Sequence, residues 1–98
     1  MAEKRYTLHA RISTENPSAI KPVLEKMFGP GNVKAGESAK DFLVEAEMHG
    51  ANARDMNRAL LTALRQVEKR SRLRAQWTAD GITEKFFDYV PKGTVKSG

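Results

Sequence analysis

The 98-residue chain has no cysteine, one tryptophan and only 7% aromatic residues. Without cysteine it can form no disulfide, thiolate nucleophile or thiolate-ligated zinc site. Its longest apolar runs fall far short of the roughly 20 residues that span a bilayer. No apolar, signal-like segment follows Met1. We therefore expect a cytoplasmic protein with no membrane partner.

Motifs for catalysis and nucleotide binding are also missing. The chain has no GxGxxG or GxxxxGK[ST] pattern, and Gly29-Pro30-Gly31 is a helix stop rather than a phosphate loop. His9, Glu45 and Glu47 are the only residues that we would nominate for an enzyme or a metal site. Their spacing matches neither a catalytic triad nor a ligand cluster. We expect no catalytic residues, no metal and no cofactor.

The length and composition indicate one domain spanning residues 1–98. Apolar residues make up 40% of the chain and charged residues 30%, as in ordinary globular proteins. We expect an ordered core over about residues 4–91. Residues 92–98 follow Pro91 and are expected to form a polar, frayed tail.

The most strongly periodic stretch runs from Asn52 to about Lys69. Asn52 can accept a hydrogen bond from the amide of Asp55, which marks the start of a helix. An apolar stripe repeats at helical spacing in this stretch; it consists of Met56, Leu60, Ala63, Leu64 and Val67. An earlier and weaker helix is expected to be short, with Pro22 in its first turn.

Strand patterns surround these helices. Alternating apolar residues predict strands over residues 6–12, 42–48 and 73–77, with a weak strand over 32–35 and an aromatic one over 82–90. This order predicts an α+β, ferredoxin-like split βαβ sandwich, β-α-β-β-α-β, with an added C-terminal hairpin strand. In that fold the first strand lies between the third and fourth. Trp77 should then be buried, and Asp80-Gly81 should form a type I′ turn.

The net charge of +5 is concentrated in one region. Between Arg54 and Arg74 lie seven basic and two acidic residues, whereas the rest of the chain is neutral. Helical spacing puts most of these cations nearly opposite the apolar stripe, where they could contact the phosphates of RNA or another polyanion. A solvated helix surface is the competing interpretation. The candidate nucleic-acid contacts are Arg54, Arg58, Arg65, Lys69, Arg72 and Arg74.

The outer sheet face supports a different hypothesis. Glu45 and Glu47 should lie there and repel phosphate, so we do not predict RNA binding on that face. Leu43, Phe87 and Tyr89 could instead form an interface, either in a homodimer or with a protein partner. In a monomer, the two aromatic side chains would fold over Leu43.

The segment from Phe42 to Lys69 resembles the small dimerising subunit of the KEOPS tRNA-modification complex. The likeness lies in the strand Leu43-Val44-Glu45-Ala46-Glu47 followed by an arginine-bearing amphipathic helix, and it covers under a third of the chain. That family is expected to end after the second helix, whereas this chain continues into a tryptophan-bearing hairpin. The resemblance transfers no functional residue and implies only a non-enzymatic assembly role. We thus expect a small binding module, with a protein-assembly subunit as the alternative.

Overall fold

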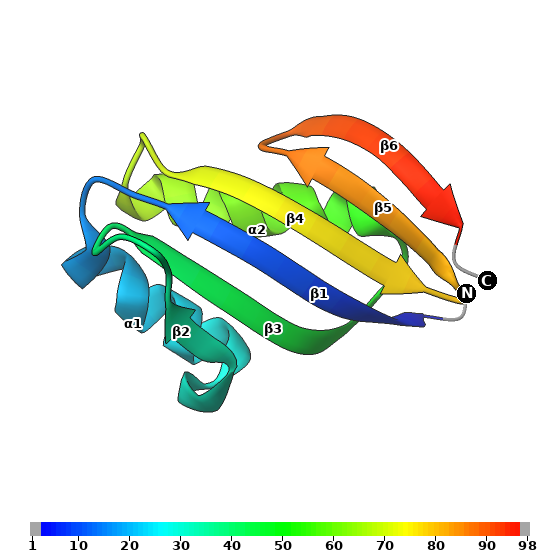
Figure 1. Ribbon diagram of the computed structural model, residues 1–98, viewed down its shortest axis with the longest axis horizontal. Helices are drawn as coiled ribbons and strands as arrows, with labels where there is room; N and C mark the ends of the chain where they lie inside the picture. Colours follow the sequence, from blue (N-terminus) through cyan, green and yellow to red (C-terminus); the bar gives the residue numbers. More distant parts are fainter. Residues whose placement is uncertain (1–2, 97–98) are drawn as a thin grey trace.

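A computed structural model describes residues 3–96 as an α+β fold, with two helices covering one face of a six-stranded antiparallel sheet (Figure 1). The sheet order is β2-β3-β1-β4-β5-β6, so β1 lies between β3 and β4, as predicted. Within residues 3–96, no helix is both long and apolar enough to cross a membrane. The elements are β1 (Lys4–Ser13), α1 (Pro17–Phe28), the 3-10 helix η1 (Pro30–Asn32), β2 (Val33–Ala35), β3 (Asp41–Gly50), α2 (Ala53–Val67), β4 (Arg72–Ala79), β5 (Ile82–Phe87) and β6 (Val90–Lys96).

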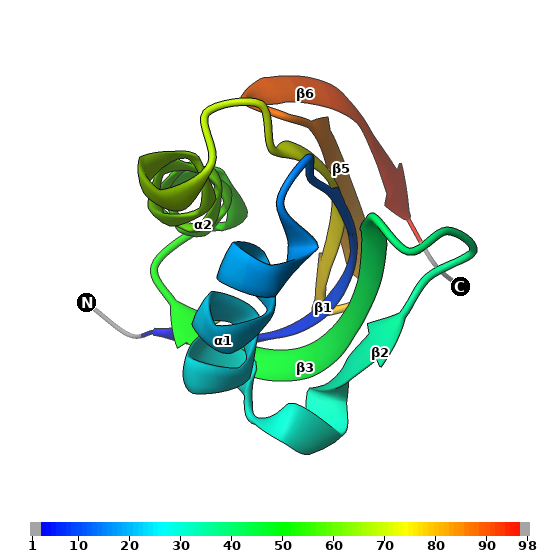
Figure 2. The same cartoon turned by 90° about the vertical axis from the view of Figure 1, so that its left-hand side faces the viewer.

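The core lies between the sheet and the two helices, which are both on the same side of the sheet (Figure 2). Successive side chains on a strand point to opposite faces, and β1 buries every second residue from Tyr6 to Ile12. Trp77 is only 1% exposed and packs edge-on against Tyr6 with ring centroids 6.3 Å apart. The prediction of a buried Trp77 is confirmed.

The first helix is longer than predicted. It starts at Pro17, where a proline loses no helical hydrogen bond, and the amides of Ala19 and Ile20 donate to the Asn16 carbonyl. Pro22 therefore lies inside α1 rather than in its first turn. Its ring is exposed, and so is Ser18, whose carbonyl loses the Pro22 donor and can bind water instead.

The buried face of α2 is rotated relative to the predicted apolar stripe. Val67 is 44% exposed, whereas Asn57 and Leu61, which were not in the stripe, are buried. Arg54 and Arg58 consequently lie on the flank of the helix, roughly 90° from its buried side at about 100° per residue, and not opposite it. The predicted cap is confirmed, because the Asn52 side chain accepts from the Asp55 amide at 2.8 Å.

The structure confirms the predicted turn at Asp80-Gly81 and corrects the predicted course of the chain after it. Asp80 and Gly81 have φ of 54° and 75° between paired Ala79 and Ile82, as a type I′ turn requires. The predicted strand over residues 82–90, however, is interrupted by a second reversal at Asp88, whose φ is 55°. Residues 90–96 then form β6, where a polar tail was predicted from residue 92. Pro91 is tolerated because β6 is an edge strand, and residues 97–98 lie outside the described range.

Candidate nucleic-acid interface

The predicted basic residues lie on two different surfaces. Arg54 and Arg58 are exposed on α2, on the helical side of the sheet. Arg72 and Arg74 alternate with buried Leu73 on β4 and therefore point to the opposite, open face. Lys69 is exposed in the turn between α2 and β4. The structure thus places on two surfaces the basic residues that the sequence analysis grouped as one nucleic-acid-binding surface.

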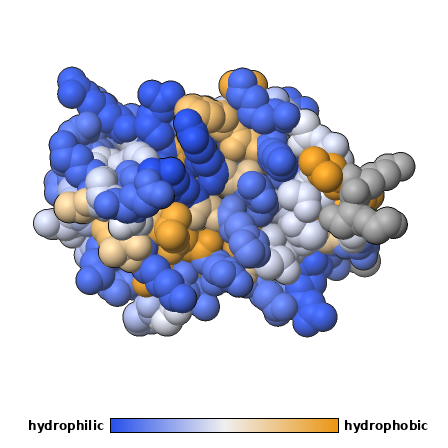
Figure 3. All heavy atoms as spheres, viewed as in Figure 1, coloured by the Kyte–Doolittle hydropathy of each residue, from blue (hydrophilic) through white to orange (hydrophobic). Residues whose placement is uncertain are grey.

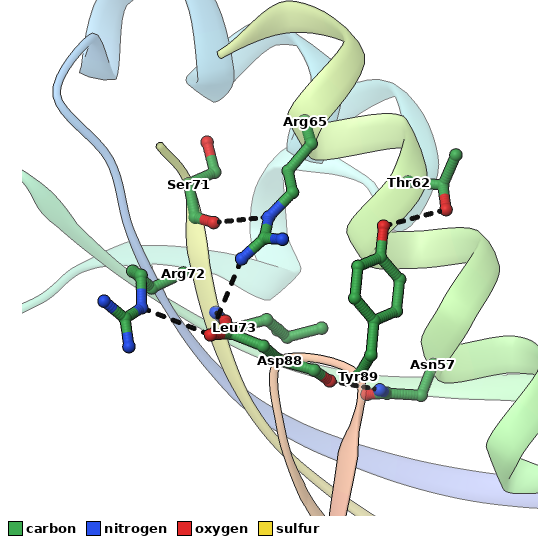
Figure 4. Close-up of polar contacts among 8 residues, drawn as sticks. All are labelled: Asn57, Thr62, Arg65, Ser71, Arg72, Leu73, Asp88 and Tyr89. Carbon is green, nitrogen blue, oxygen red and sulfur yellow. Dashed lines mark hydrogen bonds and ion pairs between the residues drawn. The ribbon is translucent and has the colours of Figure 1, made fainter. Parts of the chain in front are cut away.

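Two of these arginines are held by Asp88, the residue at the turn between β5 and β6 (Figure 4). The guanidinium groups of Arg65 and Arg72 lie 3.5 and 3.2 Å from its carboxylate. Arg65 also donates to the Ser71 carbonyl at 3.1 Å and lies over the Tyr89 ring. Arg65 is half-buried and ties α2 to β4, so its role in the fold is structural.

Asp88 also connects the helix to the core through Asn57 (Figure 4). Its carboxylate accepts from the Leu73 amide at 2.9 Å, and its carbonyl accepts from the Asn57 side chain at 2.8 Å. Asn57 in turn accepts from the indole N–H of Trp77 at 3.2 Å. Sequence reasoning missed this network. A signal was present, since Asn57 is four residues before Leu61 and lies on the same helical face.

A trough runs across the open face of the sheet, with a volume of about 910 Å³. The edge strands β2 and β6 reach out on the side away from the helices and form its two sides (Figure 2). We call this hollow the open-face trough. Its side chains come mainly from two cross-strand rows of directly opposed residues.

The first row mixes cations with apolar groups. From β2 to β5 it reads Lys34, Leu43, Arg11, Arg74 and Phe87, each residue opposed to the next. Leu43 is 44% exposed, and the Arg74 guanidinium lies 4.8 Å from the centre of the Phe87 ring. In Figure 3 hydrophobic side chains lie over the middle of this face, surrounded by hydrophilic ones. The row therefore offers both charge and apolar contact area.

The second row is polar. It reads Glu45, His9, Gln76 and Lys85 from β3 to β5, and all four side chains are exposed. None of them donates or accepts a side-chain hydrogen bond with another residue in the range 3–96. Their donors and acceptors are thus available to a ligand.

Positive charge dominates the open-face trough. Glu45 is the single acid that lines it, and it makes no ion pair within the described part of the chain. The lining cations are Arg11, Lys34, Arg74, Lys85 and Lys92. Of these, only Arg11 forms an ion pair with a described residue. It donates to Asp41 at 2.8 Å, and this hydrogen bond lowers the pKa of that carboxyl. The other four cations have no ion-pair partner among residues 3–96.

The predicted interface residues do not share one face. Leu43 and Phe87 both line the open-face trough. Tyr89 instead packs against α2, where its hydroxyl lies 3.2 Å from that of Thr62 (Figure 4). The monomer with Phe87 and Tyr89 folded over Leu43 is therefore wrong, because the reversal at Asp88 carries Tyr89 to the helical side.

The three residues nominated for an enzyme are brought near one another without forming a cluster. His9 is directly opposite Glu45, whereas Glu47 is opposite Thr7 and lies 3.8 Å from Arg5. Glu47 thus has an ion-pair partner on the neighbouring strand, whereas Glu45 has none among the described residues. No group of three or more potential ligands that could hold a metal occurs among the described residues.

Comparison with protein-family models, with curated proteins and with solved structures finds no match.

Proposed function

We propose that this chain is a small, non-enzymatic binding module for a polyanion, with RNA as the expected ligand, and that the open-face trough holds it. The observation that carries this proposal is the trough's lining of five cations against one carboxylate. A cationic groove with exposed apolar side chains is the arrangement with which proteins hold nucleic-acid backbones without reading sequence. The order β2-β3-β1-β4 with both helices on one face further leads us to infer a ferredoxin-like architecture, extended by β5 and β6.

This proposal moves the predicted contacts from the helix to the sheet. Arg74 remains a phosphate contact and is joined by Lys34, Lys85 and Lys92. Arg65 and Arg72 already have Asp88 as a partner, which makes them weaker candidates. Arg54 and Arg58 lie on the helical side and could not reach a strand that follows the trough.

The glutamates do not prevent phosphate binding on this face. The charge of Glu47 is partly offset by Arg5 at 3.8 Å. Glu45 faces an excess of lining cations, and at physiological salt charges interact mainly within about 8 Å. A phosphate placed near Lys34, Arg74 or Lys85 would therefore experience a net attraction.

The test compares two charge reversals of equal size on opposite surfaces. Labelled single-stranded RNA of about ten nucleotides is titrated with protein, and its fluorescence anisotropy is followed. Arg74→Glu with Lys85→Glu should abolish most of the affinity. Arg54→Glu with Arg58→Glu, the matched control on α2, should leave it nearly unchanged. Affinity of the unmodified chain should fall linearly with salt on a log–log plot, with a slope of about 0.7 per phosphate neutralised.

Two outcomes would contradict the proposal. Loss of binding in the helix variant alone would place the site on α2. Absence of salt-dependent binding in the unmodified chain would refute polyanion binding altogether. Trp77 fluorescence during urea unfolding shows whether each variant is folded, since the chain has a single tryptophan.

A protein-assembly role is the second candidate, supported by the exposed apolar side chains of Leu43 and Val90, which are 44% and 53% exposed. Exposed apolar patches favour partner binding. Leu43→Lys would break a homodimer but would add a cation to the trough. Light scattering tests the homodimer form of this role, which requires a dimer that Leu43→Lys dissociates, whereas the binding module stays monomeric.

A further inference from the structure

We infer that the open-face trough takes single-stranded RNA and that Glu45 makes it prefer guanine. This inference rests on the proposed function and names the ligand of the same site. It is carried by the two cross-strand rows, which combine a phosphate-binding part with a hydrogen-bonding part in one hollow.

The first row favours a single strand over a duplex. Leu43 lies between the cations Lys34 and Arg11 in this row, and Phe87 ends the row next to Arg74. Apolar and aromatic side chains gain contact only with bases whose faces are exposed, and a duplex hides those faces by stacking. The Arg74 guanidinium, 4.8 Å from the Phe87 ring centre, adds a second planar group on which a base can stack.

The second row suits the edge of a base. An ionised carboxylate only accepts hydrogen bonds and can accept two in parallel. Guanine presents two adjacent donors, N1–H and the N2 amine, on its Watson–Crick edge. Uracil presents one donor between two carbonyls, and adenine and cytosine each present one amine. Glu45 therefore fits guanine in a paired geometry that the other bases cannot match.

The neighbours of Glu45 complement this arrangement. His9 is directly opposite Glu45, and Gln76 and Lys85 continue the row toward β5. Opposed side chains on neighbouring strands are about 5 Å apart, so a base held by Glu45 comes within reach of further donors. Gln76 and Lys85 can donate to O6 of guanine or to the adjoining phosphate.

The negative charge of Glu45 gives it a role in the choice of base rather than in the overall affinity for RNA. Glu45 is the single acid among the described residues that line the trough, so it weakens phosphate binding for every sequence. Only a base that donates two hydrogen bonds to the Glu45 carboxylate compensates for the repulsion between that carboxylate and the phosphates. Specificity commonly arises from such a group, which penalises the wrong ligand.

The experiment uses oligouridine of about ten nucleotides and three variants of it, in which the two central bases are guanine, adenine or cytosine. Two guanines are too few to form a quadruplex within one strand. By fluorescence anisotropy, the guanine-containing strand should bind at least about fivefold more tightly than the other three, the lower end expected for a bidentate base contact. Glu45→Gln should reduce this preference to under about twofold and should tighten the binding of plain oligouridine.

Glu47→Gln is the matched control. Glu47 lies on the same strand and face, and its substitution changes the charge equally, but it does not line the trough. This variant should keep the guanine preference. A deca-glutamate peptide serves as a non-nucleic polyanion and should bind more weakly than oligouridine.

The outcomes separate this inference from the proposed function. Equal, salt-dependent binding of all four strands would overturn guanine selection and leave polyanion binding intact. A guanine preference that survives Glu45→Gln would overturn the role of Glu45. Deca-glutamate binding as tight as RNA would overturn the assignment of RNA as the ligand. Absence of binding to every probe would overturn both proposals.

Discussion

Asn57→Ala tests the buried network that joins α2 to β4 and to the turn at Asp88. The substitution removes both hydrogen bonds of the side chain, at 2.8 Å to the Asp88 carbonyl and at 3.2 Å from the Trp77 indole. Asn57 and Trp77 are each 1% exposed, so water has little access to the orphaned indole N–H, whereas Asp88, whose carbonyl is the other orphaned group, is half-buried. A buried polar group left without a partner costs about 1–3 kcal/mol. Two such groups give an expected loss of about 2–6 kcal/mol, toward the lower end because Asp88 is half-buried, against a typical total of about 5–15 kcal/mol.

Urea unfolding monitored by the fluorescence of Trp77 measures this loss. Thr62→Ala is the control, because it removes the exposed contact to Tyr89 at 3.2 Å and should cost no more than about 0.5 kcal/mol. A second comparison uses Trp77→Phe, which removes the indole N–H. In that background, followed by circular dichroism, Asn57→Ala should cost about 1 kcal/mol less. A loss below about 1 kcal/mol for Asn57→Ala alone would refute the reasoning, since neither orphaned group would then be penalised.

Three further predictions concern stability. Arg65→Glu should cost about 1–3 kcal/mol in urea unfolding because it loses Asp88 and the Ser71 carbonyl, whereas Arg58→Glu should stay within about 0.5 kcal/mol. Gly81→Ala should cost about 1–2 kcal/mol in thermal unfolding, because φ there is 75°. The hydrogen bond from Arg11 lowers the pKa of Asp41 in the folded state. The ionised carboxylate therefore stabilises the fold fully above its unfolded-state pKa of about 3.9, and this stabilisation is lost as the pH falls through the lower folded-state pKa. Between about pH 5 and 2, the urea midpoint should therefore fall less in Asp41→Asn than in the unmodified chain.

Much of the architecture could be predicted because it depends on local spacing. Alternation along β4 predicted that Trp77 is buried, and Asn52 three residues before Asp55 predicted the start of α2. Asp80-Gly81 predicted its turn because both residues tolerate positive φ. Each of these predictions uses residues within one element or one turn.

Predictions failed where a local pattern allowed more than one structure. Pro22 was read as a helix start, yet an exposed proline can lie inside a helix when water satisfies the freed carbonyl. Pro91 was read as a strand end, yet an edge strand has no partner on its outer side and can accept it. Neither exposure nor edge position can be read from neighbouring residues.

The sequence by itself determined which side chains within each strand share a face, and it located the excess charge near α2 and β4. Only the tertiary structure decided which strands are neighbours and hence which side chains from different elements meet. The open-face trough joins Lys34 and Lys92 from opposite edges of the sheet with Arg74 from its middle. Asp88 likewise meets Asn57, 31 residues earlier, and Arg65. Strand alternation fixes a side chain's face but not its cross-strand neighbour, because that neighbour depends on pairing between distant segments of the chain.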